Sequence, residues 1–195
     1  MSLTRITAPG EPVVTLSAVK EYLRVDNTAD DATIEHLLTA AERRYDGRDG
    51  LLGRALVTQT WELRRDSFPS GAIEVPLPPL QAVDSVTYEA RDGSIKTLAA
   101  GTDYRVDTYS EPGRIVPVAS WPRTADVPSA VVVEFTAGYG DAGSVPYPIQ
   151  TAIMQTVASW FDTSRASVAM DGGRPREVPH AGDDLAREYR IEWGF

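Results

Sequence analysis

Three glycines after an apolar stretch, in "VVVEFTAGYGDAGSVPYPIQTAI", are the first candidates for chemistry. Gly138, Gly140 and Gly143 match the letters G-x-G-x-x-G of dinucleotide-binding loops. In such a loop the helix opens at the third glycine, so that its first N–H groups meet the pyrophosphate. Here the segment 144–148, with two prolines, separates Gly143 from the expected helix, and no second parallel strand follows. The pattern therefore predicts a strand-to-helix turn that uses positive φ, and no nucleotide site.

The chain has few residues that could bind a metal ion and none that could supply a thiol. It has no cysteine, which excludes disulfides, thiolate zinc sites and a thiol nucleophile. The two histidines, His36 and His180, lie far apart without metal-ligand spacing, and no G-x-S-x-G elbow accompanies them. We expect no metal and no cofactor.

Paired carboxylates remain as candidates for acid–base work or for holding a cation. Asp30-Asp31 and Asp183-Asp184 both stand where a helix is expected to begin, and helix N-termini favour acids. Capping is therefore the favoured interpretation of both pairs. An enzyme that uses carboxylates is the weakest of the functional alternatives.

The net charge is −9, with 19 Lys and Arg against 28 Asp and Glu. Residues 1–55, 56–145 and 146–195 carry net charges of −2, −5 and −2, so no basic region is concealed by the average. A nucleic-acid binder normally has a Lys/Arg stripe that neutralises phosphates, and its absence argues against tight DNA binding. No stretch approaches the length of a membrane span, and we expect a soluble protein made in a cytoplasm.

Helical periodicity dominates the first third of the chain. "TLSAVKEYLRV" predicts a helix capped by Thr15 or Ser17, and "NTADDATIEHLLTAAERRYDG" predicts a second one, in which Thr28 and Asp31 have capping-box spacing. The second helix has one apolar stripe, formed by Ile34, Leu37, Leu38, Ala41 and Tyr45. His36 falls on the opposite face, where we expect it to be exposed.

From residue 56 the period changes to two, which predicts strands. "VTQTWELRRDSF" places Val57, Gln59, Trp61 and Leu63 on one face, and the proline-rich "PSGAIEVPLPPL" indicates an edge strand or connector. Two hairpins follow, with turns at "RDGS" and "SEPG". "SAVVVEFTAGY" is the strand expected to be most buried.

A long helix, a linker and an aromatic tail complete the chain. Pro148 suits the first position of a helix, where its missing N–H costs nothing, and the apolar stripe comprises Ile149, Ala152, Ile153, Thr156, Val157 and Trp160. The fold class is therefore α+β: a small helical bundle (two N-terminal helices plus a long helix near 148–162) with a β-rich insertion of about six short strands and a C-terminal tail. We expect a helical part at 1–55, the β-rich insertion at 56–139, the long helix at 140–165, a flexible linker at 166–182 and a docking tail at 183–195.

The tail is the feature least suited to solvent, because apolar residues at a terminus gain nothing unless something covers them. Two alternatives stay open: the tail folds back onto its own domain, or it docks on another subunit or protein. Aromatic residues beside arginine are common anchors of protein–protein interfaces. The candidate partner-binding residues are Leu185, Arg187, Tyr189, Arg190, Ile191, Trp193 and Phe195.

Several stretches together resemble the head–tail connector (adaptor) proteins of long-tailed bacteriophages and phage-like gene transfer agents. They are "LSAVKEYLRVD", "ATIEHLLTAAERR", "GRALVTQTWELRRDSFP", "IEVPLPPLQAVDSVTYEARDG", "DYRVDTYSEPGRI", "VEFTAGYGDAGSVPYPIQTAIMQTVASWF" and "VPHAGDDLAREYRIEWGF". Many relatives have Tyr-x-x-Arg after the long helix, where this chain has "WFDTSR".

The resemblance implies a structural protein of a phage-like particle, without enzymatic activity. Members of the family form a ring, commonly dodecameric, beneath the portal protein, and this ring continues the DNA channel toward stopper and tail proteins. It implies a place in the neck of the particle, assembly in the bacterial cytoplasm, no membrane contact, and DNA that passes without specific binding. The C-terminal segment would engage the portal or a neighbouring subunit. A stand-alone binding module with a β-rich domain is the second alternative.

Overall fold

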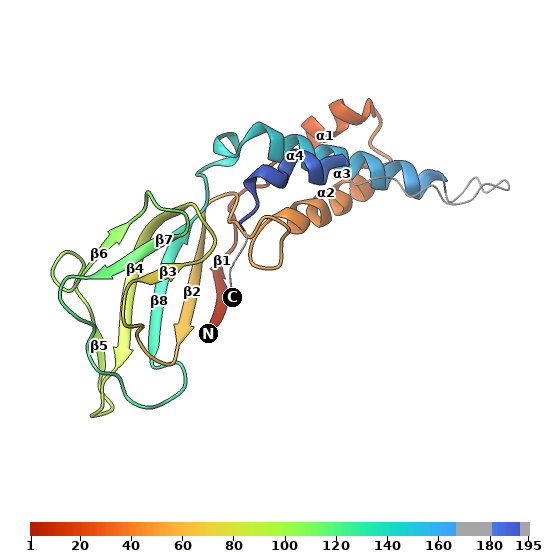
Figure 1. The fold of residues 1–195 in the computed structure, drawn as a ribbon. Coiled ribbons are helices and arrows are strands. Elements are labelled where there is room, and N and C mark those ends of the chain that lie inside the picture. The colour runs from red at the N-terminus through yellow and green to blue at the C-terminus, as the bar shows by residue number, and fades with distance from the viewer. Residues whose placement is uncertain (167–180, 192–195) are drawn as a thin grey trace. The chain divides into compact units, whose positions relative to one another are not determined.

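A computed structural model describes residues 1–166 and 181–191 of the chain, and its contacts divide into two units (Figure 1). The β unit comprises residues 1–10 and 54–140. The helical unit comprises residues 11–53 and the chain from residue 141 onward. Each unit is thus built from two separate pieces of the chain, and the longer piece of the β unit is inserted between two helices.

The predicted α+β class is confirmed by the element order. The helices are α1 (Leu16–Leu23), α2 (Asp31–Tyr45), the 3-10 turn η1 (Ala142–Ser144), α3 (Tyr147–Ala166), α4 (Ala181–Ala186) and the 3-10 turn η2 (Arg187–Tyr189). The strands are β1 (Ser2–Thr7), β2 (Gln59–Arg65), β3 (Ile73–Val75), β4 (Leu80–Glu89), β5 (Ile95–Thr97), β6 (Tyr104–Asp107), β7 (Gly113–Pro117) and β8 (Val131–Ala137).

The β unit is a sandwich of two antiparallel sheets over one core. The larger sheet has the order β1-β2-β8-β4-β5 and the smaller one β3-β7-β6. Trp61, Leu63 and Phe135 of the larger sheet share their core with Ile73 and Ile115 of the smaller. The alternation predicted for residues 57–63 is confirmed, because every second side chain there is buried. Both predicted hairpins are present, as β4–β5 and β6–β7.

Strand β1 was not predicted. The sequence analysis assigned residues 1–55 to a helical part, whereas residues 2–7 pair antiparallel with β2 at the edge of the larger sheet. All of its side chains are exposed except Leu3, which is partly buried. An edge strand exposed on both faces has no alternation of apolar and polar residues that could reveal it. The described residues therefore contain eight strands where about six were expected.

The helical unit has the predicted apolar stripes. In α2 the side chains of Ile34, Leu38, Ala41 and Tyr45 are buried, Leu37 is partly buried, and His36 is exposed. In α3 the buried set is Ile149, Ala152, Ile153, Thr156, Val157 and Phe161, while Trp160 is partly buried. Figure 1 shows α2 and α3 side by side. These stripes form the interior of the bundle.

The helix starts follow the predictions only in part. Thr15 caps α1, and its hydroxyl accepts a hydrogen bond from the backbone N–H of Ala18. The capping box of Thr28 and Asp31 is wrong: the N-cap residue of α2 is Asp30, whose side chain makes no capping hydrogen bond, and the Asp31 carboxylate pairs with Lys20. The Asp31 carboxylate thus binds the charged ammonium group of Lys20 in α1, where the capping box would have it accept a neutral backbone N–H.

The glycine-rich turn has the structural role that was predicted for it. Gly138 and Gly140 have φ of 126° and 131°, whereas Gly143, in η1, has no positive φ. A Cβ on Gly138 would lie 2.7 Å from the carbonyl carbon of Val57, so a side chain has no room there. Pro148 is the second residue of α3 and not the first. The glycine at position 138 lets the end of β8 approach the backbone of Val57 and Thr58, which lead into β2.

Candidate functional site: the C-terminal segment

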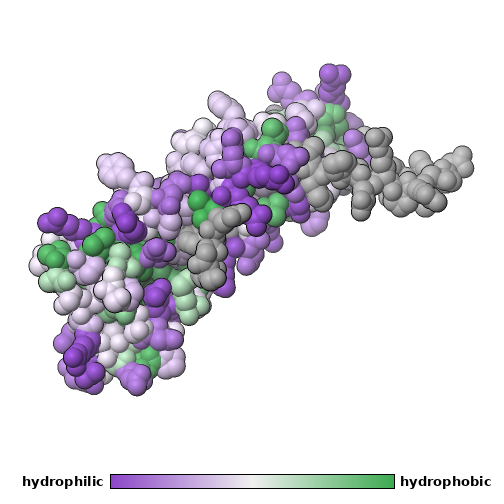
Figure 2. Space-filling model, in the orientation of Figure 1, coloured by the Kyte–Doolittle hydropathy of each residue, from purple (hydrophilic) through white to green (hydrophobic). Residues whose placement is uncertain are grey.

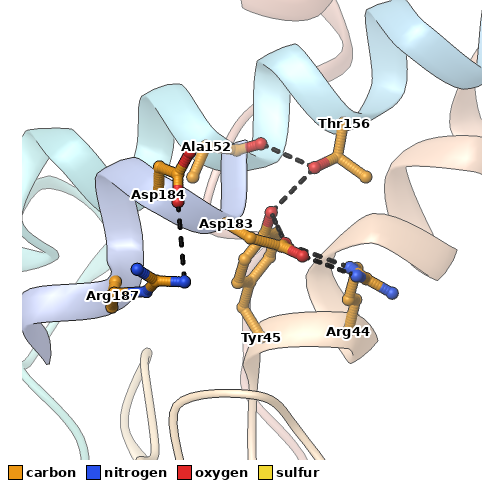
Figure 3. A network of polar contacts seen from close by, with 7 residues as sticks. All are labelled: Arg44, Tyr45, Ala152, Thr156, Asp183, Asp184 and Arg187. Carbon is orange, nitrogen blue, oxygen red and sulfur yellow. Dashed lines mark hydrogen bonds and ion pairs between the residues drawn. The ribbon is translucent and has the colours of Figure 1, made fainter. Parts of the chain in front are cut away.

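The segment 181–191 contains the described part of the predicted docking tail, residues 183–191, together with residues 181 and 182 of the predicted linker. It begins with α4, which lies alongside α3 (Figures 1 and 3). The acid pair Asp183-Asp184 belongs to the first turn of α4 and does not precede it, because the helix starts at Ala181. Of the two alternatives, the described residues take the first, since they pack on their own helical unit.

Close backbone approach explains the glycine at position 182. A Cβ at Gly182 would lie 2.5 Å from the carbonyl oxygen of Ala152, 2.8 Å from Tyr45 Oη and 2.9 Å from Thr156 Oγ1. These distances are below any normal carbon contact. The first turn of α4 therefore sits directly on α3 and on the end of α2, at a place that admits no side chain.

Asp183 connects α4 to α2 through its carboxylate (Figure 3). Arg44 Nη2 donates to Oδ2 at 2.7 Å, and Arg44 Nε donates to Oδ1 at 3.3 Å. The hydroxyl of Tyr45 donates to Oδ1 at 3.0 Å. This is a forked, charge-assisted arrangement, which sets the position of α4 geometrically as well as energetically.

Thr156 extends this network into α3. Its Oγ1 lies 2.8 Å from Tyr45 Oη and 2.8 Å from the carbonyl oxygen of Ala152. A carboxylate is the stronger acceptor, so Tyr45 gives its only proton to Asp183, and its oxygen accepts from Thr156. The hydroxyl of Thr156 is thereby shared between Tyr45 and its own helix. Three helices meet in one directional chain of donors that ends on a carboxylate.

The electrostatics follow from this geometry. The hydrogen bond to Asp183 raises the pKa of Arg44 above its ordinary value, and burial raises the pKa of the Tyr45 hydroxyl. The Arg44 and Asp183 side chains are 27% and 29% exposed, so water screens the pair only in part. The tyrosine stays protonated and the arginine charged at every pH at which the protein would work.

The structure separates the predicted site residues into three groups. Leu185, Arg187 and Arg190 are exposed, whereas Tyr189 and Ile191 are partly buried. The backbone N–H of Ile191 donates to the carbonyl oxygen of Leu52 at 3.0 Å, which ties the end of the segment to the helical unit. Trp193 and Phe195 lie outside the described residues. Sequence reasoning thus found the segment but not the residues that hold it.

The residues that hold the C-terminal segment in place are Gly182 and Asp183 on α4, Arg44 and Tyr45 on α2, and Thr156 on α3. One signal for them was available: Thr156 is a polar residue in an apolar stripe, and a buried hydroxyl needs a partner. The Asp183-Asp184 pair was noticed and assigned to capping. Its bond to Arg44 joins residues 139 positions apart, a proximity that one sequence does not contain.

Metal and membrane sites gain no support from the described part of the chain. Residues 1–166 and 181–191 contain no group of three or more His, Asp or Glu that could hold a metal ion. Within the same ranges no helix is both long and apolar enough to span a bilayer. On the face of the helical unit seen in Figure 2, hydrophilic side chains predominate.

Comparisons with known proteins agree on one relationship. The sequence profile of the head completion protein family (HCP) matches residues 12–174, which is most of the chain. No curated protein sequence matches it.

Solved structures share the fold. A chain in the neck of an empty GTA particle, computed with C6 symmetry, has a TM-score of 0.76 and 19% identity, covering 100% of this chain and 98% of that one. A chain in the virion of a native gene transfer agent (GTA) particle gives the same values. A chain in the neck of a native GTA particle, computed with C12 symmetry, has a TM-score of 0.70 and 17% identity, with the same coverage. By its sequence profile, and with a fold that these neck proteins share, the chain belongs to the head completion protein family, as its resemblance to phage connectors predicted.

Proposed function

We propose that this chain is a head–tail connector (adaptor) in the neck of a phage or gene transfer agent particle. The observation that carries the proposal is the fold similarity to GTA neck proteins along 100% of the chain, with a family profile over residues 12–174. The role is structural, without enzymatic activity and without a cofactor. The particle is assembled in the bacterial cytoplasm.

The connector is a homo-oligomeric ring, which we propose to be dodecameric. Two of the similar neck structures were computed with C6 and C12 symmetry, and a twelve-fold ring is compatible with both. The portal protein lies on its head side and stopper or tail proteins on its other side. DNA passes through the ring without specific binding.

The charge distribution supports a passage for DNA. The helical unit has 10 Lys and Arg against 17 Asp and Glu, a net charge of −7, and the β unit has 9 against 11, a net charge of −2. A surface with such an excess of acids repels phosphates within a Debye length of about 8–10 Å. We therefore assign the channel-facing surface to the helical unit.

The C-terminal segment is the proposed docking site for the portal or a neighbouring subunit. Gly182 and Asp183 hold α4 on one side, while Leu185, Arg187 and Arg190 are exposed. Tyr189 and Ile191, which are partly buried, belong to the same proposed docking set, as do Trp193 and Phe195 by sequence. An apolar and aromatic group beside two arginines has the composition of an interface anchor.

Loss of the chain from a particle-producing host tests the overall function. We expect DNA-filled heads and separate tails in electron micrographs, and restoration of complete particles when the chain is supplied again. Complete, infectious or DNA-transferring particles without the chain would contradict the proposal. A purified monomer that is stabilised by a small ligand would favour the stand-alone binding module instead.

Charge reversal tests the docking segment without unfolding it. The double variant R187E/R190E changes two exposed arginines and leaves Asp183 and Gly182 in place. We expect it to lower incorporation into particles at least tenfold. The matched control is R43E/R48E, which makes the same change at two exposed arginines of the same unit. Equal incorporation of both variants would remove the segment from the interface.

A further inference from the structure

The turn between β6 and β7 exposes an aromatic side chain on a rigid support. Tyr109 is 98% exposed. The carboxylate of Asp107 accepts from the backbone N–H groups of Tyr109 and Ser110 (both 3.1 Å), from Ser110 Oγ (2.7 Å) and from Arg114 Nη2 (2.7 Å). One side chain thus fixes both the turn and the strand that follows it.

A second brace holds the same turn, residues 107–114, from the other side. Arg54 Nη2 donates to Glu111 Oε2 at 2.6 Å, and the Arg54 side chain is only 8% exposed. Single exposed hydrophobic residues are common on protein surfaces. Tyr109 differs from these because the backbone of its turn is already ordered. Binding through Tyr109 therefore loses little conformational entropy.

The same β unit contains a pocket with an aromatic wall. The rings of Phe68 and Trp121 stack at 4.6 Å with an interplanar angle of 5°, and Pro69 and Pro122 lie beside them in a cavity of about 600 Å³. Trp121 Nε1 donates to the carbonyl oxygen of Gly71 at 2.7 Å, which fixes the indole. A cavity of this size accommodates a phenol ring.

The remaining lining residues have the chemistry that a phenol uses. Arg91 and Arg123 are exposed at this pocket, and guanidinium groups bind the faces of aromatic rings. Asp66 and Asp126 supply carboxylate acceptors for a hydroxyl group. Asp66 uses Oδ1 for the backbone N–H of Ser129 and keeps Oδ2 for another donor.

The turn and the pocket lie at opposite ends of the β6–β7 hairpin. Residues 108–113 connect the paired ends Asp107 and Arg114, whereas the pocket residues 120–126 follow the other end, where Tyr104 pairs with Pro117. Tyr109 therefore does not reach the pocket of its own β unit. A surface that is complementary to a different surface of the same molecule makes a head-to-tail contact, and such contacts form a ring when the rotation from copy to copy closes.

We propose that Tyr109 of one copy inserts into the Phe68–Trp121 pocket of the next copy. This contact rests on the proposed ring and identifies the β unit as one source of its subunit interface. The pocket binds the phenol ring between its aromatic wall and the two arginines. The occupant is a second copy of this chain.

Two variants of Tyr109 and one control variant test how much the phenol ring of Tyr109 contributes to assembly. Y109A should lower ring or particle incorporation at least tenfold, as for a hot-spot aromatic residue, whereas Y109F should change it only a few-fold. The control Y147A truncates a tyrosine that is 79% exposed in the helical unit, and it should assemble normally. Because Tyr109 is almost fully exposed, all three variants should keep the thermal stability of the wild type.

Cysteine cross-linking tests the geometry directly, since the chain has no cysteine of its own. Particles assembled from a mixture of Y109C and S120C copies should give a covalent dimer under oxidation, and particles from either variant alone should not. Ser120 is an exposed residue of the pocket. If the wild type forms rings, the cysteine pair gives no covalent dimer and Y109A assembles normally, this contact is overturned and the proposed function still stands. A wild-type chain that never associates would overturn both.

Discussion

Helix α3 contacts two helices of its unit in different ways. Toward α2 both partners contribute stripes of buried apolar side chains, including Ile34 and Leu38 on one and Ile153 and Val157 on the other. Among residues 182–186 of α4, whose burial the structure describes, only Gly182 and Ala186 are buried, and Asp183 supplies the specific bonds. One contact is apolar and the other is polar.

This difference separates stability from positioning. Burial of apolar surface stabilises by about 25 cal/mol per Å² and depends little on direction. A forked carboxylate–arginine bond contributes less net free energy but fixes orientation. We therefore expect α2 and α3 to form the lasting body of the unit, and α4 to be a segment that is positioned on it and can be released without unfolding it.

The largest effect should come from the apolar contact. Ile153 is fully buried in α3, and I153A removes its branched side chain. We expect a loss of about 2–5 kcal/mol in the free energy of unfolding, measured with denaturant. The control V118A truncates a side chain that is 50% exposed and should change stability by less than about 0.5 kcal/mol. Equal effects of both variants would contradict an apolar interior at Ile153.

A methyl group at position 182 should release α4 and spare the body. In G182A the new Cβ meets the carbonyl oxygen of Ala152 at 2.5 Å, an overpacking that costs about 1–3 kcal/mol. Amide hydrogen exchange should therefore accelerate in residues 181–191 while α2 and α3 keep their protection. The control is G143A, whose Cβ would meet nothing closer than Asp141 Oδ1 at 3.6 Å. Unchanged exchange in G182A would refute the close approach of α4.

A smaller effect should follow from removal of one hydroxyl group in the polar contact. Y45F leaves the Arg44–Asp183 pair in place and lets Thr156 keep its bond to Ala152. We expect a cost of about 0.5–1.5 kcal/mol, the net value of one such hydrogen bond.

A double-mutant cycle of Y45F with D183N reports whether the two side chains interact. Their effects should not add. Y147F, at an exposed tyrosine, is the matched control and should be neutral. Additive effects of Y45F and D183N would show that the hydroxyl does not serve Asp183.

The same contrast explains how much of the molecule was predictable from its sequence. The stripes of α2 and α3 and the alternation of β2 repeat along the chain, so their periods reveal them. Strand β1 has no such period, because both its faces are exposed. The bonds of Asp183 have no local signal either, since Arg44 and Tyr45 become its neighbours only when the bundle folds.

The prediction of the docking tail was limited in the same way: local sequence revealed the segment but not its tertiary contacts. Composition identified a segment rich in apolar, aromatic and arginine residues, and the described part of that segment does lie on a surface of the unit. Which of its side chains point inward depends on Gly182, whose small size was not a recognisable signal in a stretch with several glycines. Tertiary contacts, and not local propensity, decide the details of this site.

The smallest effect concerns a carboxylate that costs stability. Glu42 on α2 accepts the backbone N–H of Val14 at 3.2 Å, yet burial raises its pKa above the ordinary value. A carboxyl group with a raised folded pKa binds its proton more tightly in the folded state, so the stability of the protein should increase as pH falls through that pKa.

E42Q keeps an acceptor for Val14 and has no charge to bury. We expect E42Q to be slightly more stable than the wild type at pH 7, and the difference to be lost at pH 4, which lies below the raised pKa of Glu42, so that the wild-type side chain is already neutral. Denaturant unfolding at both values measures this, with E35Q at an exposed position of the same helix as the control. A difference that grew toward low pH would mean that the bonds to Glu42 outweigh its burial, and the contrast between Glu42 and the ion-paired Asp183 would then disappear.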